Sequence, residues 1–231
     1  MRIQKYLSEQ KILSRREAEE YIRLGLIKLN GKIVTEMGIQ IDPEKDQIEI
    51  LPVPPNLTEE KMTIAFNKPR GVVCSREKSE GQTIFDLLPQ FEHLNAVGRL
   101  DKQSEGLILL SNDGTVTNAV TGDKHTTEKE YQVWVREDIM PAKLEKMSEG
   151  ILLEDGMTLP AKTEKTGSHS YTIILKEGRK HQIRRMADAI QLTITNLKRT
   201  RIGNIKLNDL QKGEYRVLLK DETDTLKKMS L

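Results

Sequence analysis

The sequence predicts an α+β protein with two domains. Residues 1–50 combine two short helical patterns with a β-hairpin signal. Three prolines among residues 51–56 favour a stiff, extended linker. Residues 62–220 alternate short apolar runs with helical stretches, which is typical of α+β domains with a sizeable sheet. The expected organisation is a small domain at 1–51, a proline-rich linker at 52–61 and a larger domain at 62–231.

The small domain is expected to contain two helices. Apolar residues between Ile3 and Leu13 have the spacing of an amphipathic helix. Ser14 and Glu17 then form a capping box, because the hydroxyl and the carboxylate can satisfy free backbone amides at the start of a second helix. This second helix is expected to end near Gly25.

A short hairpin is expected to follow these helices. Asn30-Gly31 lies between two β-like runs, and this dipeptide accepts the positive φ angles that a tight hairpin turn requires. The expected strands of the small domain are residues 27–29, 32–34 and 47–51.

The larger domain shows a mixture of strand and helix patterns. Short apolar runs predict strands at Met62–Phe66, Gly106–Leu110, Glu130–Val135, Ser170–Leu175 and Tyr215–Leu219. Helical patterns span Pro141–Met147 and Arg179–Ile190. These patterns alone leave open whether the strands are parallel or antiparallel.

Composition indicates a globular protein of a reducing compartment. The chain is 36% hydrophobic and 31% charged, and its apolar runs are far shorter than the ~20 residues that cross a bilayer. Met1–Leu13 carries scattered charges, unlike a secretory signal. Cys74 is the single cysteine, which excludes an internal disulfide and a metal site with several thiolates. We therefore expect a cytoplasmic protein without a membrane partner.

Neither a metal ion nor an organic cofactor is expected. The four histidines and one cysteine are too few and too scattered to form a ligand cluster. No glycine-rich nucleotide-binding loop is visible, and no apolar stripe suggests a dimer. A monomer without a cofactor is the expected state.

The charge is unevenly distributed along the chain. The whole sequence has a formal net charge of +2, whereas Lys176–Arg201 contains eight Lys or Arg and two acidic residues. Such a local excess suits a polyanion, although charge alone equally fits a solvated, salt-bridged face. If the partner is a nucleic acid, the expected contacts in this region are Arg179, Lys180 and Arg185.

The small domain offers a second basic surface. Its second helix starts with two arginines beside free backbone amides, an arrangement that can bind phosphates. Solvated arginines on a charged helix are the alternative. The order and spacing of Ile3–Leu7, Ser14–Ala18, Ile22–Gly25 and Leu29–Lys32 resemble the S4 RNA-binding domain. The resemblance implies binding to structured RNA through shape and phosphates. The expected contacts are Ser14, Arg15, Arg16, Arg23, Lys28 and Lys32.

One segment places a carboxylate in a setting suited to chemistry. Asp101 lies between Arg99 and Lys102 on a loop that leads into the apolar run Gly106–Leu110. A buried strand is rigid, so the loop before it can hold a reactive side chain in a cleft. From the residues alone, a helix cap or a surface ion pair is an alternative role for Asp101.

Gly98–Leu110 closely resembles the catalytic motif of the pseudouridine synthases, Gly-Arg-Leu-Asp followed by Ser or Thr and then Gly-Leu-Leu. Ser104 stands where the family more often has threonine, and both residues supply a hydroxyl. The resemblance implies that Asp101 is the catalytic carboxylate. We also expect Arg99 and Lys102 to contact neighbouring phosphates.

Two further segments follow in the order of the family. Phe66–Val72 resembles its first motif, a strand that ends in a Lys-Pro-x-Gly turn, although a type II turn by itself would select Pro69 and Gly71. Lys129-Glu130-Tyr131 resembles the Lys-x-Tyr element, which implies that Tyr131 packs against the target base. A lone tyrosine at this position would otherwise be a core residue.

Glu177–Met186 resembles the third motif of the family. The basic residue after Gln-Ile pairs with the catalytic aspartate there, which makes Arg184 the expected partner of Asp101 and would keep the carboxylate ionised. Ile183 is expected to form part of the floor under the base. We expect His181 to be a structural hydrogen-bonding residue.

The resemblance covers residues 1 to about 220, and it sets the functional expectation. His181–Met186 and Lys198–Gly203 look most like the branch that modifies single ribosomal-RNA nucleotides, the RsuA, RluB and RluF group. The family implies a large, mainly antiparallel mixed sheet flanked by helices, and isomerisation of a uridine in ribosomal RNA, here expected in the large subunit (23S). The alternatives are the same chemistry on 16S ribosomal or transfer RNA, and a non-catalytic RNA-binding ribosome-assembly factor.

Overall fold

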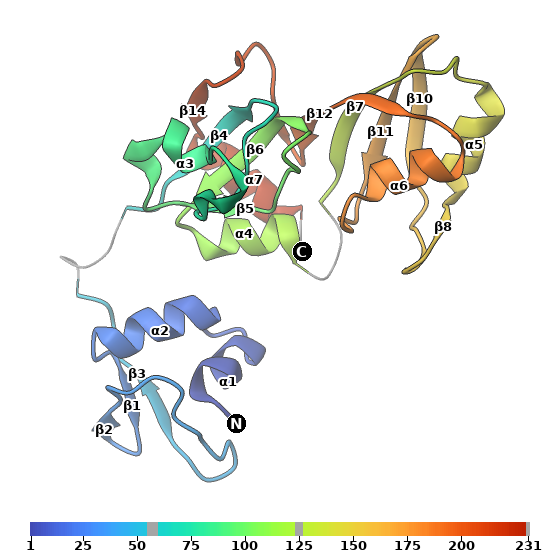
Figure 1. Cartoon of the computed structure of the whole chain (residues 1–231). Helices are drawn as coiled ribbons and strands as arrows, with labels where there is room; N and C mark the ends of the chain where they lie inside the picture. Colours follow the sequence, from blue (N-terminus) through green and yellow to red (C-terminus); the bar gives the residue numbers. More distant parts are fainter. Residues whose placement is uncertain (55–59, 123–126, 230–231) are drawn as a thin grey trace. The chain divides into compact units, whose positions relative to one another are not determined.

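The computed structural model describes residues 1–54, 60–122 and 127–229 (Figure 1). The chain forms two compact units, Met1–Glu60 and Lys61–Leu231, each with its own hydrophobic core. Part of the expected proline-rich linker, residues 55–59, lies outside the described residues. Within the described ranges, no helix combines the length and apolar character that a bilayer crossing requires.

The first unit begins with two short helices, α1 (Ile3–Glu9) and α2 (Arg15–Arg23). The predicted capping box is present at α2: Ser14 Oγ accepts from the Glu17 amide at 3.2 Å, and the Glu17 carboxylate accepts from the Ser14 amide at 2.8 Å. Helix α1 ends earlier than its apolar spacing predicts, because Lys11 adopts a left-handed φ of 58° that breaks the helix.

A three-stranded antiparallel sheet completes the first unit. Its strands are β1 (Ile27–Leu29), β2 (Lys32–Ile33) and β3 (Ile48–Ile50), in the order β2-β1-β3. Asn30 and Gly31 have φ values of 52° and 79°, as the predicted hairpin turn requires. The core of this unit consists of apolar side chains from both helices and the sheet: Ile3, Leu7, Ala18, Ile22, Ile27, Val34 and Ile41.

A nine-stranded mixed sheet forms the centre of the described part of the second unit. The strand order is β10-β11-β7-β12-β6-β4-β14, with β13 beside β12 and β5 beside β6. Strands β12 and β6 pair in parallel and the other pairs are antiparallel, which confirms the expected mainly antiparallel sheet. The strands are β4 (Thr63–Lys68), β5 (Asn95–Val97), β6 (Glu105–Ser111), β7 (Lys129–Val135), β10 (Lys162–Gly167), β11 (Ser170–Leu175), β12 (Ile194–Ile202), β13 (Ile205–Lys206) and β14 (Tyr215–Val217).

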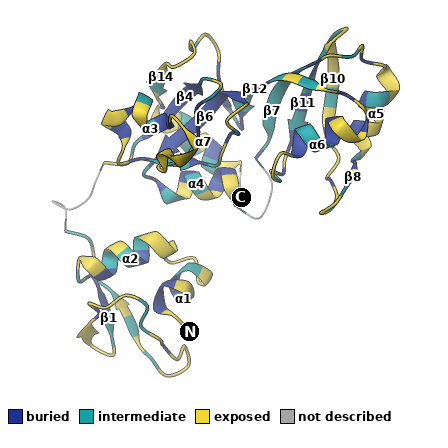
Figure 2. Cartoon of the chain, viewed as in Figure 1, coloured by how far each residue is buried: buried dark blue, intermediate teal, exposed yellow. Residues whose placement is uncertain are grey.

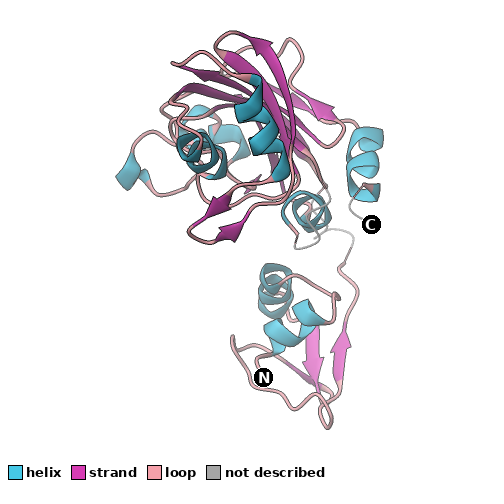
Figure 3. Ribbon diagram, turned by 90° about the vertical axis from the view of Figure 1, so that its right-hand side faces the viewer, coloured by secondary structure: helices cyan, strands magenta, loops and turns pink. Residues whose placement is uncertain are grey.

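Helices cover different parts of this sheet (Figure 3). Helices α5 and α6 pack on β7, β11 and β12, whereas α4 and α7 pack on β4 and β6, and α3 lies against the other face of β4 and β6. A two-stranded hairpin, β8 (Leu152–Leu153) and β9 (Gly156–Met157), lies outside the main sheet. The helices are α3 (Ile84–Leu87), α4 (Gly114–Thr121), α5 (Pro141–Glu149), α6 (Gln182–Ala189) and α7 (Lys220–Lys228).

Strand β6 is buried on both faces of the sheet (Figure 2). Leu107 and Leu109 belong to the cluster under α4 and α7, whereas Ile108 and Leu110 belong to the cluster on the opposite face. Because both faces are covered, the centre of the strand is a continuous apolar run, without the alternation of apolar and polar residues seen in half-exposed strands. The loop that carries Asp101 is therefore attached to one of the most deeply buried strands of the unit.

The parallel junction between β6 and β12 is short and close. It pairs Lys198 with Glu105 and Arg199 with Gly106. Gly106 has a φ of +103°, and a Cβ atom added there would lie 2.3 Å from the carbonyl oxygen of Arg199. Only glycine combines this φ with so close an approach of another backbone.

Two cationic side chains lie inside the sheet near this junction. Arg199 is only 3% exposed, and it donates from Nε to the Leu107 carbonyl at 2.7 Å and from Nη1 to the Arg99 carbonyl at 3.4 Å. Lys129, at the start of β7, is half-buried. Burial and then the charge of Arg199 lower the pKa of Lys129 to about 8.

We expect Gly106→Ala to destabilise the second unit by about 2–4 kcal/mol, because the methyl group meets backbone atoms that cannot rotate away. Urea unfolding measures this change. Gly178→Ala is the matched control, since no atom lies within 4 Å of its added Cβ and its φ is not positive. Equal stability of the two variants would contradict the described junction.

Lys129→Met should change the pH dependence of stability. The lysine pKa falls from 10.5 in the unfolded chain to about 8 in the folded protein, so the unfolded chain holds more protons between these values. Wild-type stability therefore gains from this residue as pH rises from 8 to 10.5. The stability advantage of Lys129→Met should be largest below pH 8 and shrink above it. Urea unfolding at several pH values tests this, with the exposed Lys206→Met as the control; a difference that is constant with pH refutes it.

Candidate active site

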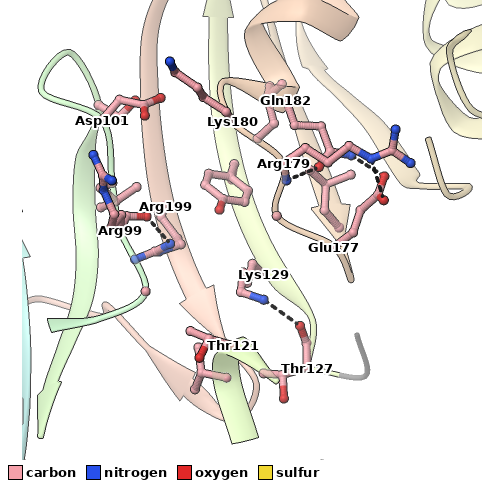
Figure 4. A pocket seen from close by; sticks show the side chains of 18 of the residues that line it. Arg99, Asp101, Thr121, Thr127, Lys129, Glu177, Arg179, Lys180, Gln182 and Arg199 are labelled. Carbon is pink, nitrogen blue, oxygen red and sulfur yellow. Dashed lines mark hydrogen bonds and ion pairs between the residues drawn. The ribbon is translucent and has the colours of Figure 1, made fainter. Parts of the chain in front are cut away.

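A cavity of about 580 Å³ lies where the Asp101 loop meets β7, β12 and the segment before α6 (Figure 4). Segments far apart in the sequence line it, among them Val97–Asp101, Ala119–Gly122 and Leu175–Arg184. Its volume falls in the ~300–1,000 Å³ range of small-molecule sites. Residues 123–126, next to one of these segments, lie outside the described residues.

Backbone hydrogen bonds fix the loop that carries Asp101. The Gly71 amide donates to the Lys102 carbonyl at 2.7 Å. The thiol of Cys74 accepts from the Leu100 amide at 3.4 Å and donates to the Leu100 carbonyl at 3.3 Å. Within the loop, the Ser104 amide donates to the Asp101 carbonyl at 2.9 Å. The loop therefore has a defined backbone position beside the cavity.

The turn after β4 supplies one of these contacts. Gly71 has a φ of 89°, which fits the predicted turn. Lys68 is completely buried, and its ammonium group donates to the Pro69 carbonyl at 3.0 Å and the Val72 carbonyl at 2.7 Å. Lys68 thus stabilises the turn that holds the Asp101 loop, and it does not line the cavity.

Asp101 lines the cavity with its side chain 37% exposed. Its carboxylate lies 3.5 Å from Nε2 of His181, so the two form an ion pair whenever the imidazole is protonated. The sequence did not indicate this contact, although His181 directly precedes the Gln182-Ile183-Arg184 segment of the third motif. His181 has a left-handed φ of 52° at the start of α6, which turns the chain into the helix.

The expected ion pair between Asp101 and Arg184 is not formed in the described structure. Arg184 Nη2 instead donates to the Gln103 carbonyl at 3.2 Å and to Ser104 Oγ at 3.4 Å. Arg184 lies three residues after His181, about one helical turn further on, so it meets the end of the loop rather than its aspartate. Arg184 holds the loop, and His181 contacts the carboxylate.

Two predicted base-contacting residues do line the cavity. Tyr131 on β7 lies between two core clusters, and the guanidinium carbon of Arg199 is 6.0 Å from the centre of its ring. Ile183 is 5% exposed and belongs to the core under α6. An apolar side chain and an aromatic ring thus line the same cavity as Asp101.

The cations expected to contact phosphate have different surroundings. Arg99 lines the cavity, and the exposed Lys180 lies near Asp101 at the same end (Figure 4). Lys102 does not line it, because its ammonium group donates to the Glu80 carbonyl on the surface. Of these three residues, Arg99 and Lys180 are the ones available to a ligand in the cavity.

Arg179 and Arg185, the two arginines of the basic region 176–201 that were expected to bind RNA, form ion pairs within the protein. Arg185 binds Asp155 through both terminal nitrogens at 2.9 and 3.0 Å, and this contact holds the pKa of the Asp155 carboxyl below its usual range. Arg179 pairs with Glu177 at 3.1 Å and donates to the Gly156 carbonyl at 2.9 Å. Both guanidinium groups connect α6 and its preceding loop to neighbouring segments. Part of the positive charge of the basic region is therefore used in salt bridges within the protein.

The predicted RNA contacts of the first unit are mostly at its surface. Arg15, Arg16 and Lys32 are exposed. Arg23 pairs with Glu20 at 2.9 Å, and Lys28 pairs with Glu49 at 3.5 Å, both in exposed positions where such pairs contribute little stability. Ser14 uses its hydroxyl in the helix cap.

No group of three His, Cys, Asp or Glu side chains in the described ranges is placed to bind a metal ion. The side chains that line the cavity include a carboxylate, an imidazole, a phenol and several cations. A partly exposed carboxylate beside an aromatic ring is suited to acting on the sugar or base of a bound nucleotide.

Comparisons with known proteins agree with this geometry. Residues 62–189 match the family model of RNA pseudouridylate synthases, and residues 1–48 match the S4 domain. The chain is 36% identical over 230 residues to the dual-specificity RNA pseudouridine synthase RluF of Escherichia coli (strain K12), covering 99% of this chain and 79% of that protein.

Other relatives carry related names. The chain is 35% identical to ribosomal small subunit pseudouridine synthase A of Haemophilus influenzae, covering 99% of this chain and all of that protein. It is 34% identical to ribosomal large subunit pseudouridine synthase B of Bacillus subtilis, covering 99% and 96% of the two chains. A crystal structure of a pseudouridylate synthase superposes with a TM-score of 0.73 at 34% identity over 98% of this chain and 99% of that one. The chain belongs to the RNA pseudouridylate synthase family and carries an N-terminal S4 domain.

Proposed function

We propose that this enzyme converts a specific uridine of 23S ribosomal RNA to pseudouridine in the cytoplasm, with Asp101 as the catalytic carboxylate. The supporting observation is the position of Asp101, partly exposed in the cavity that Tyr131 and Ile183 also line. Its loop is held by backbone contacts, so the carboxylate is positioned before any ligand binds. Relatives named for the large and for the small ribosomal subunit support a ribosomal substrate.

Recognition in this proposal combines a flipped base with phosphate contacts. A uridine in a stem must leave the stack before a carboxylate can reach it, which costs a few kcal/mol. The uracil then stacks on Tyr131 above Ile183, and Arg99 and Lys180 bind adjacent phosphates. Arg15, Arg16 and Lys32 of the S4 domain add phosphate contacts, supported by Arg23 and Lys28 where RNA displaces their weak surface pairs.

Asp101 acts as an ionised carboxylate in each possible route. It attacks the sugar, attacks the base, or removes a ribose proton so that the base departs. In all three routes Arg184 and Ser104 keep the loop in place, and His181 orients the carboxylate. The substrate and product are isomers, so the overall reaction consumes no second substrate.

Asp101→Ala should abolish turnover and leave RNA affinity within a few fold, since the loop backbone holds its position without this side chain. Asp138→Ala, which removes a carboxylate that is 81% exposed and pairs only with a surface histidine, is the matched control. Tritium release or nucleoside chromatography measures turnover, and filter binding measures affinity. Substantial activity of Asp101→Ala would end the assignment.

The substrate is tested by mapping pseudouridine in a strain that lacks the protein, through carbodiimide-blocked primer extension. Loss of one stop in 23S RNA, restored by the wild type and not by Asp101→Ala, is the expected result. Loss of a stop in 16S or transfer RNA would correct the substrate and keep the chemistry. Unchanged maps of all three RNAs would instead indicate a non-catalytic RNA-binding protein.

A further inference from the structure

Arg199 is a buried cation with unused hydrogen-bonding capacity. Its Nε and Nη1 atoms donate to the carbonyl oxygens of Leu107 and Arg99. Its Nη2 atom is buried and has no hydrogen-bond partner among the described residues. The side chain lines the cavity, so this unpartnered donor lies beside the space that a ligand would occupy. A buried donor without a partner is costly, and in an enzyme it marks a position that a substrate can fill.

No carboxylate in the described structure pairs with this guanidinium group. On the same strand, Arg201 has the opposite environment: it binds Glu128 at 3.1 Å and Glu130 at 3.1 Å. The two acids that flank Lys129 are thus engaged by Arg201, outside the cavity. Asp101, the acid at the other end of the cavity, faces His181. Glu177, also in the cavity lining, pairs with Arg179.

Lys129 adds a second positive charge next to Arg199. It lines the cavity, and its only described hydrogen bond is a long one of 3.4 Å to the Thr127 carbonyl. The two cations repel each other. After burial, the charge of Arg199 is the second cause that lowers the pKa of Lys129. Figure 4 shows Arg199 between Arg99 and Lys129 along the wall of the cavity. Two cations in a partly dry site without a counter-charge favour an anionic ligand.

Tyr131 lies near Arg199, and it is also the residue on which the reacting uracil is proposed to stack. The guanidinium carbon of Arg199 lies 6.0 Å from the centre of the tyrosine ring. A uracil stacked on this ring, as the proposed function requires, would share the tyrosine ring as a neighbour with the guanidinium group of Arg199. Arg199 and Lys129 would then face the base, whereas Arg99 and Lys180 would face the backbone of the RNA.

The reaction creates an anion at this position. Breaking the N1–C1′ bond leaves its electron pair on N1, from where the charge spreads to O2 and O4 of the uracil. The ring then turns, C5 bonds to C1′, the C5 proton leaves and N1 gains a proton, so no atom is gained or lost. The detached ring is therefore negatively charged between bond breaking and reattachment, whichever way Asp101 assists.

We infer that Arg199, through Nη2 and supported by the charge of Lys129, stabilises the uracil anion while it is detached from the ribose. This role rests on the proposed function and adds a leaving-group site to it. Donors fixed in a water-poor cavity are worth about 10²–10³ in rate when they meet developing charge. The carbonyl contacts of Arg199 fix its guanidinium group before the bond breaks, so little reorganisation is needed.

The test compares two RNAs under single-turnover conditions with saturating enzyme. Both are the stem-loop around the mapped uridine, and one carries 5-fluorouridine at that position, whose ring is more acidic and a better leaving group. Glycosidic-bond breakage is followed by digestion and chromatography. Arg199→Gln should slow bond breakage in the uridine RNA by about 10²-fold. The slowing in the fluorinated RNA should be smaller by a factor of at least about five. Lys129→Met, which loses one long hydrogen bond, should show the same pattern with a smaller loss.

Arg201→Gln is the matched control, because it removes an arginine from the same strand outside the cavity. It should affect both RNAs equally or not at all. Arg199→Lys should recover part of the rate lost in Arg199→Gln, since it restores the charge. An equal loss on both RNAs for Arg199→Gln and Lys129→Met would overturn the inference while leaving the proposed function intact. Wild-type enzyme that converts neither RNA would overturn both.

Discussion

The close parallel approach of β12 to β6 at Gly106 determines where the active site forms. It joins the strand that follows the Asp101 loop to the strand that carries Arg199, over only two paired positions. Because the backbones nearly touch, Arg199 can extend along β6 and bind the carbonyls of Leu107 and Arg99. One contact between two strands thus links the loop that carries Asp101 to the strand that carries Arg199.

Local signals predicted much of the fold. The capping box at Ser14, the Asn30-Gly31 turn and the strand Ser170–Leu175 were confirmed, because each depends on neighbouring residues. Strands β10 and β12 were not predicted, since their sequences are rich in lysine, arginine and threonine rather than alternating. Strand β12 tolerates its charges because Arg201 has one acidic partner on β7 and one just before it, and Arg199 reaches backbone carbonyls. Those partners are distant in sequence, so no local pattern could reveal them.

The candidate site was likewise predicted only in part. Motifs in the sequence brought Asp101, Tyr131 and Ile183 to attention, and the structure places all three at one cavity. The expected pairing of Arg184 with Asp101 was wrong for the described structure, because Arg184 lies about one helical turn beyond His181 and meets the end of the loop instead. Residue type indicates a charge but not the direction in which its side chain points. Arg199 and Arg185 look alike in the basic region, yet one is buried in the cavity and the other is paired on the surface.

The attachment of the Asp101 loop through peptide groups bears on how such enzymes diverge. The bond between the Gly71 amide and the Lys102 carbonyl uses no side chain, and the peptide of Leu100 is held by the thiol of Cys74. Substitutions of exterior side chains therefore leave both attachments of the loop in place. A lineage built on this frame can exchange one target nucleotide for another through its outer residues, while the bond-breaking machinery is inherited unchanged.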